Sequence, residues 1–155
     1  MTATRSWLAL LVGVLVCHAA GAATHRVDDS GSQVQGPSLR MKWDEPVPQA
    51  GARAMVSGAT TVLVRLHLAQ WRGRQGRVYM TLPAQSAGEF TATWTTRGVL
   101  LPGALRAGER ALVYAGPIQT ELLEDTMRLL IQADGQRLTR AEQLDFSFEI
   151  DLGTP

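Results

Sequence analysis

The stretch LDFSFEIDL, residues 144–152, alternates apolar and polar side chains at every position. A period of two places the apolar side chains on one face of an extended strand and the polar ones on the other. The stretch therefore predicts a β-strand that covers a core with one face and meets water with the other.

Seven further segments show a similar pattern, and residues typical of turns separate most of them. In 60–68, for example, Val62, Val64 and Leu66 share one side of the predicted strand, while Pro102-Gly103 is a typical turn dipeptide. The pattern predicts an all-β fold, an antiparallel immunoglobulin-like β-sandwich of seven to nine short strands. The seven segments are 38–44, 60–68, 77–82, 89–95, 99–101, 110–115 and 126–133.

Two short stretches depart from this pattern. Thr139-Arg140-Ala141-Glu142 has the spacing of a helix capping box and is interpreted as one helical turn before the last strand. The stretch 121–125 is interpreted as either a turn of helix or a polar edge. Neither is long enough to change the all-β prediction.

The beginning of the chain has the three parts of a secretory signal peptide. Arg5 supplies the basic start, an apolar run extends over 7–16, and small residues fill 19–23. The apolar run is about half the roughly 20 residues that a membrane-spanning helix needs, so we expect no membrane span in the mature chain. The pattern predicts cleavage near residue 23, Sec-type export, and a periplasmic or extracellular, cell-surface location.

The predicted organisation has three parts: a signal peptide over 1–23, a flexible N-terminal lead over 24–37 and one β-sandwich domain over 38–155. The lead is rich in Asp, Ser and Gly and has only Val27 and Val34 as sizeable aliphatic residues, so we expect it to bury little. Cys17 follows Val16, whereas lipid-attachment signals place a small residue there. Cleavage removes Cys17 and leaves a mature chain without thiol or disulfide chemistry.

Charge and residue types exclude several classes of function. The chain has 15 Lys and Arg against 14 Asp and Glu, and loss of Arg5 makes this 14 against 14. A neutral chain lacks the positive field of a nucleic-acid-binding protein, so we expect no nucleic acid partner. After cleavage the only histidines are His25 and His67. We therefore predict no metal site and no cofactor.

Two arrangements could carry catalysis, and we interpret both as structural. His67 could meet a serine and an aspartate in a small hydrolase, but the sequence has no strained nucleophile turn. Glu121, Glu124 and Asp125 could supply paired carboxylates for glycoside hydrolysis, but they are interpreted as a solvated acidic turn. We therefore expect that the protein is not an enzyme.

The binding candidates come from the tryptophans and from a cluster of arginines. Trp43 and Trp94 fall on the apolar sides of their predicted strands, which leaves Trp71 as a candidate exposed ring. Three guanidinium groups follow it on a predicted hairpin loop and could grip an acidic partner, a phosphate or an anionic sugar. The predicted binding residues are Trp71, Arg72, Arg74 and Arg77.

We predict a bacterial envelope or surface module that binds a protein partner or takes part in an assembly, without catalysis. A carbohydrate-binding module is one alternative, with a glycan as ligand of Trp71. The other is a fibre subunit, because an exported, cysteine-free, all-β chain of this size resembles subunits of chaperone-usher fibres in composition and strand rhythm. That resemblance implies an open groove where a strand is missing, although 24–37 is more polar than the donor segment of such subunits.

Overall fold

The computed structural model describes residues 23–36, 38–45, 51, 54–84, 89–138 and 143–153. Residues 1–22, which hold nearly all of the predicted signal peptide, and the predicted helical turn at 139–142 lie outside them. The described part is all-β, with a single 3-10 turn, η1 (Ala69–Trp71). Its strands are β1 (Thr24–Arg26), β2 (Gln33–Gln35), β3 (Lys42–Trp43), β4 (Met55–His67), β5 (Gln75–Thr81), β6 (Phe90–Thr96), β7 (Gly103–Arg106), β8 (Arg110–Pro117), β9 (Leu122–Asp134) and β10 (Ser147–Leu152).

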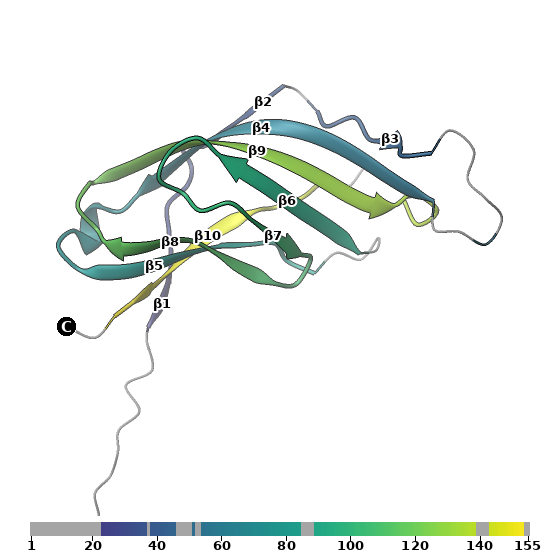
Figure 1. The fold of residues 1–155 in the computed structure, drawn as a ribbon. Helices are drawn as coiled ribbons and strands as arrows, with labels where there is room; N and C mark the ends of the chain where they lie inside the picture. The colour runs from purple at the N-terminus through teal and green to yellow at the C-terminus, as the bar shows by residue number, and fades with distance from the viewer. Residues whose placement is uncertain are drawn as a thin grey trace, which may run out of the picture.

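The strands form two antiparallel sheets that face each other in a sandwich-like arrangement (Figure 1). The four-stranded sheet has the order β1-β10-β5-β8. The six-stranded sheet has the order β2-β4-β9-β6-β7, and β3 pairs with β4 beside β2. The connection through η1 carries the chain from β4 in one sheet to β5 in the other. The prediction of an antiparallel all-β fold is therefore confirmed.

The longest strands, β4 and β9, form the middle of the six-stranded sheet. They pair over 13 residues each, from Met55 opposite Asp134 to His67 opposite Leu122. At about 3.3 Å per residue this ladder is about 43 Å long. Both strands are longer than the short strands that the sequence predicted, because β4 begins at Met55 rather than at 60 and β9 begins at Leu122 rather than at 126.

The side chains predicted to face inward form the core between the sheets. Val64, Leu66, Val78 and Met80 are at most 1% exposed. Other members of this core from the two sheets include Met127, Leu129, Ile131, Val113, Phe148 and Ile150, all of them buried. Alternation along most of the predicted strands therefore predicted the buried face correctly, since successive side chains of a strand point to opposite faces of its sheet.

The structure differs from the prediction for 24–37. Within that segment β1 pairs with β10 and β2 pairs with β4, so the segment joins both sheets. Val27, between the two strands, is only 1% exposed, and its N–H donates to Phe148 O at 2.8 Å. A polar sequence can add to a sheet edge because the pairing uses backbone groups, which the composition does not reveal.

Two further predictions are corrected near the ends of strands. Residues 99–101 form no strand, although Leu100 is buried, and β7 begins at Gly103, where a turn was predicted. Trp43 is 52% exposed instead of buried, because β3 contains only two residues and the ring lies on Gly135 at the end of β9. Trp94 is 2% exposed, as predicted. No helix within the described ranges has the length and apolar character needed to cross a membrane.

Candidate functional site

Trp71, which the sequence predicted to offer an exposed ring, is buried. It ends η1 with 5% of its surface exposed, and its ring centroid lies 6.0 Å from that of His25. The turn directs the ring inward, because the Trp71 N–H donates to Leu68 O at 2.9 Å and closes the backbone on itself. The platform required by the carbohydrate-binding alternative is therefore covered. Trp71 instead closes one end of the two sheets.

The arginines that follow Trp71 do not lie on a hairpin loop. Arg72 and Arg74 belong to the connection between the sheets, whereas Arg77 lies within β5. Arg72 Nη1 is 3.0 Å from Glu121 Oε1, and both side chains are more than half exposed. Arg77 pairs in register with Asp151 of β10, on the outer face of the four-stranded sheet. The three guanidinium groups are all exposed but are divided between two surfaces.

Replacing Arg72, Arg74 and Arg77 together by Ala is expected to lower the free energy of unfolding by less than about 1 kcal/mol, because exposed ion pairs contribute little. Urea unfolding measures this change. Arg110→Ala is the control that should cost more, about 1–2 kcal/mol, because that guanidinium also lies over the Tyr79 ring at 4.2 Å. A larger loss from the triple variant would make the three arginines structural.

His67 is exposed at the end of β4. Its backbone N–H donates to Asp28 O at 2.9 Å, which joins β4 to the segment after β1. In the described ranges, no hydrogen bond connects its ring with a serine or a carboxylate, the contact that the hydrolase alternative requires. Across those same ranges, no three His, Cys, Asp or Glu side chains are arranged to hold a metal ion.

The acidic residues 121–125 were interpreted as a surface turn, and that interpretation is wrong. Strand β9 begins at Leu122, so Glu124 and Asp125 point to opposite faces of the six-stranded sheet. Glu124 faces outward, with Oε1 2.6 Å from Arg65 Nε in a close ion pair that lacks hydrogen-bond geometry. Asp125 faces inward and is 5% exposed.

Asp125 is the one buried charged residue of the described core, and it organises residues 97–100. Its Oδ1 accepts hydrogen bonds from the backbone N–H groups of Gly98 at 2.7 Å and Arg97 at 3.3 Å, and also from the adjacent Thr126 at 2.6 Å. Its Oδ2 accepts one from Leu100 at 2.8 Å. The sequence held a signal for this role, because Asp125 occupies an inward position between the core residues at 123 and 127.

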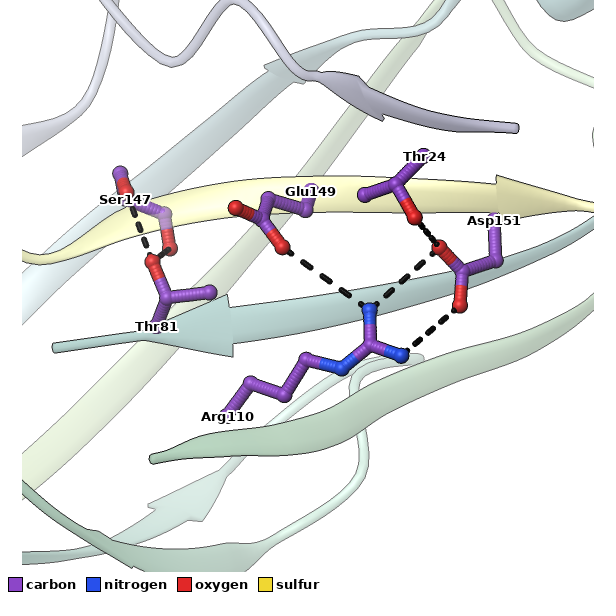
Figure 2. A network of polar contacts seen from close by, with 6 residues as sticks. All are labelled: Thr24, Thr81, Arg110, Ser147, Glu149 and Asp151. Carbon is purple, nitrogen blue, oxygen red and sulfur yellow. Dashed lines mark hydrogen bonds and ion pairs between the residues drawn. The ribbon is translucent and has the colours of Figure 1, made fainter. Parts of the chain in front are cut away.

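A second polar network covers the outer face of the four-stranded sheet, and Figure 2 shows how its side chains point toward one another. Arg110 reaches from β8 across β5, with Nη2 3.2 Å from Asp151 Oδ2 and Nη1 3.9 Å from Glu149 Oε2. From the other side, Thr24 Oγ1 donates to Asp151 Oδ1 at 2.6 Å. The network therefore fastens β1 to the sheet. Nothing in the local sequence indicated it, since its members come from three strands.

These contacts lower the pKa of Asp151 below its usual value, chiefly through the hydrogen bond from Thr24; burial opposes this shift, and Arg110 and the charge of Arg77 add to it. A lowered folded-state pKa means that the folded protein binds fewer protons than the unfolded chain. The stability that ionised Asp151 contributes is fully present above its unfolded-state pKa of about 3.9. It is lost as the pH falls through the folded-state pKa.

We expect the wild type to lose stability below about pH 4 more steeply than an Asp151→Asn variant, because only the wild type must protonate this carboxylate. Urea unfolding between pH 3 and pH 7 measures the difference. Thr24→Val removes the largest cause of the shift and should reproduce part of the effect. Parallel curves for wild type and Asp151→Asn would contradict the assignment.

A cavity of about 570 Å³ lies between the two sheets, on the side where β2 and β4 face β1 and β10. Its walls are apolar and come from both sheets: Val62, Val64, Met127 and Leu129 from one, Met80 and Phe148 from the other. Its rim carries Arg26, Asp29 and Asp145. A volume of this size with apolar walls and a few polar groups at the mouth is typical of a binding site. We call this cavity the inter-sheet groove.

The residues that precede β10 lie beside the inter-sheet groove, beyond the point where β10 pairs with β5 and β1. β5 accompanies β10 only as far as Thr81 opposite Ser147, and on the other side β1 leaves after the bond from Val27 to Phe148. Residues 143–146, which precede β10, belong to no strand. Leu144 and Phe146 of this stretch are partly buried and line the groove. The apolar groove therefore runs alongside the residues that lead into β10.

No protein-family model matches the sequence, and a search of curated proteins finds no significant relative.

Proposed function

We propose that this chain is an exported, non-catalytic module of the bacterial envelope or surface, folded as an immunoglobulin-like sandwich after removal of its signal peptide. Its partner is a protein, which it binds by accepting an extended segment into the inter-sheet groove. The observation that carries the proposal is the inter-sheet groove itself, which is lined by apolar side chains of both sheets and has the exposed Arg26 and Asp145 beside them.

Residues 143–146, which lie beside the groove and belong to no strand, are where we propose that such a segment is held. A strand that adds to a free edge gains backbone hydrogen bonds, and pockets that receive alternate side chains give specificity. Leu144 and Phe146 face the groove, so a segment pairing with 143–146 would direct every second side chain into the same space. The mechanism is strand addition together with apolar burial.

Selection of peptides from a random display library on the immobilised mature domain tests the proposal. Enriched peptides are expected to carry apolar residues at alternate positions, because only one face of an added strand meets the groove. Val62→Trp fills the groove from β4 and is expected to abolish their binding. Leu130→Trp is the matched control, because Leu130 is 40% exposed on the other face of the six-stranded sheet. Peptides that bind both variants equally would refute the groove as the site.

The open groove also favours the fibre-subunit alternative, in which the inserted segment comes from another subunit. That alternative predicts a chain that aggregates when it is produced without a chaperone. A folded, monomeric domain from such a preparation would contradict it and leave the proposal of a separate protein partner standing.

A further inference from the structure

A second hollow, of about 400 Å³, lies on the outer face of the six-stranded sheet, away from the inter-sheet groove. It is located where β4, β9 and the end of β6 run side by side. Residues with hydroxyl or guanidinium groups form most of its lining: Thr61, Thr95, Thr126, Arg97 and Arg128, together with Ala59 and Thr60 of β4. This composition differs from the apolar walls of the groove and indicates a different kind of ligand.

The strand register places the hydroxyl groups around one guanidinium. Arg128 of β9 is paired with Thr61 of β4 on one side and with Thr95 of β6 on the other. All three point to the outer face of the sheet, since their neighbours at 127 and 129 are buried. A threonine hydroxyl is a hydrogen-bond donor as well as an acceptor. The hollow therefore combines hydroxyl donors with the fixed fork of an arginine.

Arg97 supplies the second positive charge, and its backbone is held in place. The Arg97 N–H donates to Thr126 O at 3.2 Å and to Asp125 Oδ1 at 3.3 Å. The buried Asp125 also bonds Gly98 and Leu100, so the chain around Arg97 is fixed by a carboxylate that remains inside the core. Because its backbone is already ordered, binding through Arg97 costs only the entropy of ordering its side chain.

The carboxylates nearest to this pair in sequence are engaged elsewhere. Glu124 forms an ion pair with Arg65, and Asp125 is bonded to backbone N–H groups. Across the part of the chain that the structure describes, neither Arg97 nor Arg128 forms an ion pair. Two arginines thus line one hollow, and no Asp or Glu is among the described residues that line it.

We propose that this hollow binds a doubly charged tetrahedral oxyanion, a phosphate or sulfate group. Guanidinium groups bind such oxyanions through paired, charge-assisted hydrogen bonds, and the threonine hydroxyls complete the set of donors. Two arginines match two negative charges. The volume exceeds what one such group fills, which leaves space for the molecule that carries it. The site is separate from the proposed function and depends on different residues.

Calorimetric titration of the mature domain at constant ionic strength tests the site, with inorganic sulfate, inorganic phosphate and glycerol 3-phosphate as probes and chloride as the reference. Saturable binding of sulfate or phosphate that chloride does not reproduce is expected. Tighter binding of glycerol 3-phosphate would identify an esterified group as the ligand, and equal or weaker binding a free anion. Heat no greater than that from chloride for all three probes would overturn the proposal.

Arg97→Gln and Arg128→Gln are each expected to raise the dissociation constant about tenfold, as the loss of a charge-assisted hydrogen bond predicts. Arg106→Gln removes an exposed arginine from β7 of the same sheet and should leave binding unchanged. All three positions are exposed, so the variants should fold, and circular dichroism verifies that they do. Equal weakening by Arg106→Gln would mean a general charge effect and would refute the site.

Discussion

Asp125→Ala is expected to lower the free energy of unfolding by about 3–5 kcal/mol, one of the two largest effects that the structure predicts. The carboxylate is 5% exposed and accepts hydrogen bonds from the backbone N–H groups at 97, 98, 100 and 126. Its removal leaves donors near the core without an acceptor, and each such donor costs about 1–3 kcal/mol. Urea or thermal unfolding followed by circular dichroism measures the loss.

Two comparisons separate this role from a general effect of losing a negative charge. Glu124→Ala, at the adjacent position but with an exposed ion pair, should cost less than about 1 kcal/mol. Asp125→Asn keeps the shape of the side chain and one acceptor oxygen. It should therefore lower the free energy of unfolding by less than Asp125→Ala and by more than Glu124→Ala. If Asp125→Ala and Glu124→Ala cost the same, the carboxylate does not hold residues 97–100.

Gly98 provides an independent test of the same contact. An ideal Cβ on Gly98 would lie 2.9 Å from Asp125 Oδ1, closer than carbon and oxygen approach without a shift. Gly98→Ala should therefore destabilise the wild type, and the same change should cost less in the Asp125→Ala background, where the crowding is gone. Additive losses in a double-mutant cycle would contradict direct contact between the two positions.

Trp71→Ala is expected to cost about 3–5 kcal/mol of unfolding free energy, because it removes a large buried ring and leaves a cavity. The ring is 5% exposed and packs with the core where η1 connects the two sheets. If Trp71 were instead a surface contact residue, the substitution would change binding and leave stability intact. Chemical unfolding of the purified variant distinguishes these outcomes.

The matched control is Trp43→Ala, since Trp43 is 52% exposed and lies at the end of a two-residue strand. Its loss should be about 1 kcal/mol or less, because truncation there leaves little enclosed space. Trp71→Phe retains an aromatic ring and should recover most of the stability lost in Trp71→Ala. Equal losses at 43 and 71 would mean that the difference in burial does not govern stability here.

The candidate surfaces show where prediction from the sequence reached its limit. The arginines at 72, 74 and 77 are neighbours in the chain, yet the structure divides them between a connection and a strand. Arg97 and Arg128 are 31 positions apart and meet because β6 pairs with β9. Closeness in sequence indicates closeness in space only within one element. The register between strands decides the rest.

The sequence did not reveal the residues of the inter-sheet groove either, although the fibre-subunit alternative implied an open groove. Its walls come from strands that are distant in the chain, and its rim depends on the crossing from β1 in one sheet to β2 in the other. Asp125 is the exception, because a carboxylate at an inward position of an alternating strand is a signal that the sequence itself carries.

The sequence by itself determined that the protein is all-β and which face of most strands is buried, because the alternation of side chains is a local property of an extended backbone. Only the tertiary structure decided which strands pair, that polar residues 24–26 and 33–35 complete both sheets, and that Trp71 rather than Trp43 is covered. Pairing is made by backbone groups that every sequence possesses. Burial at the end of a strand depends on what distant parts of the chain place over it.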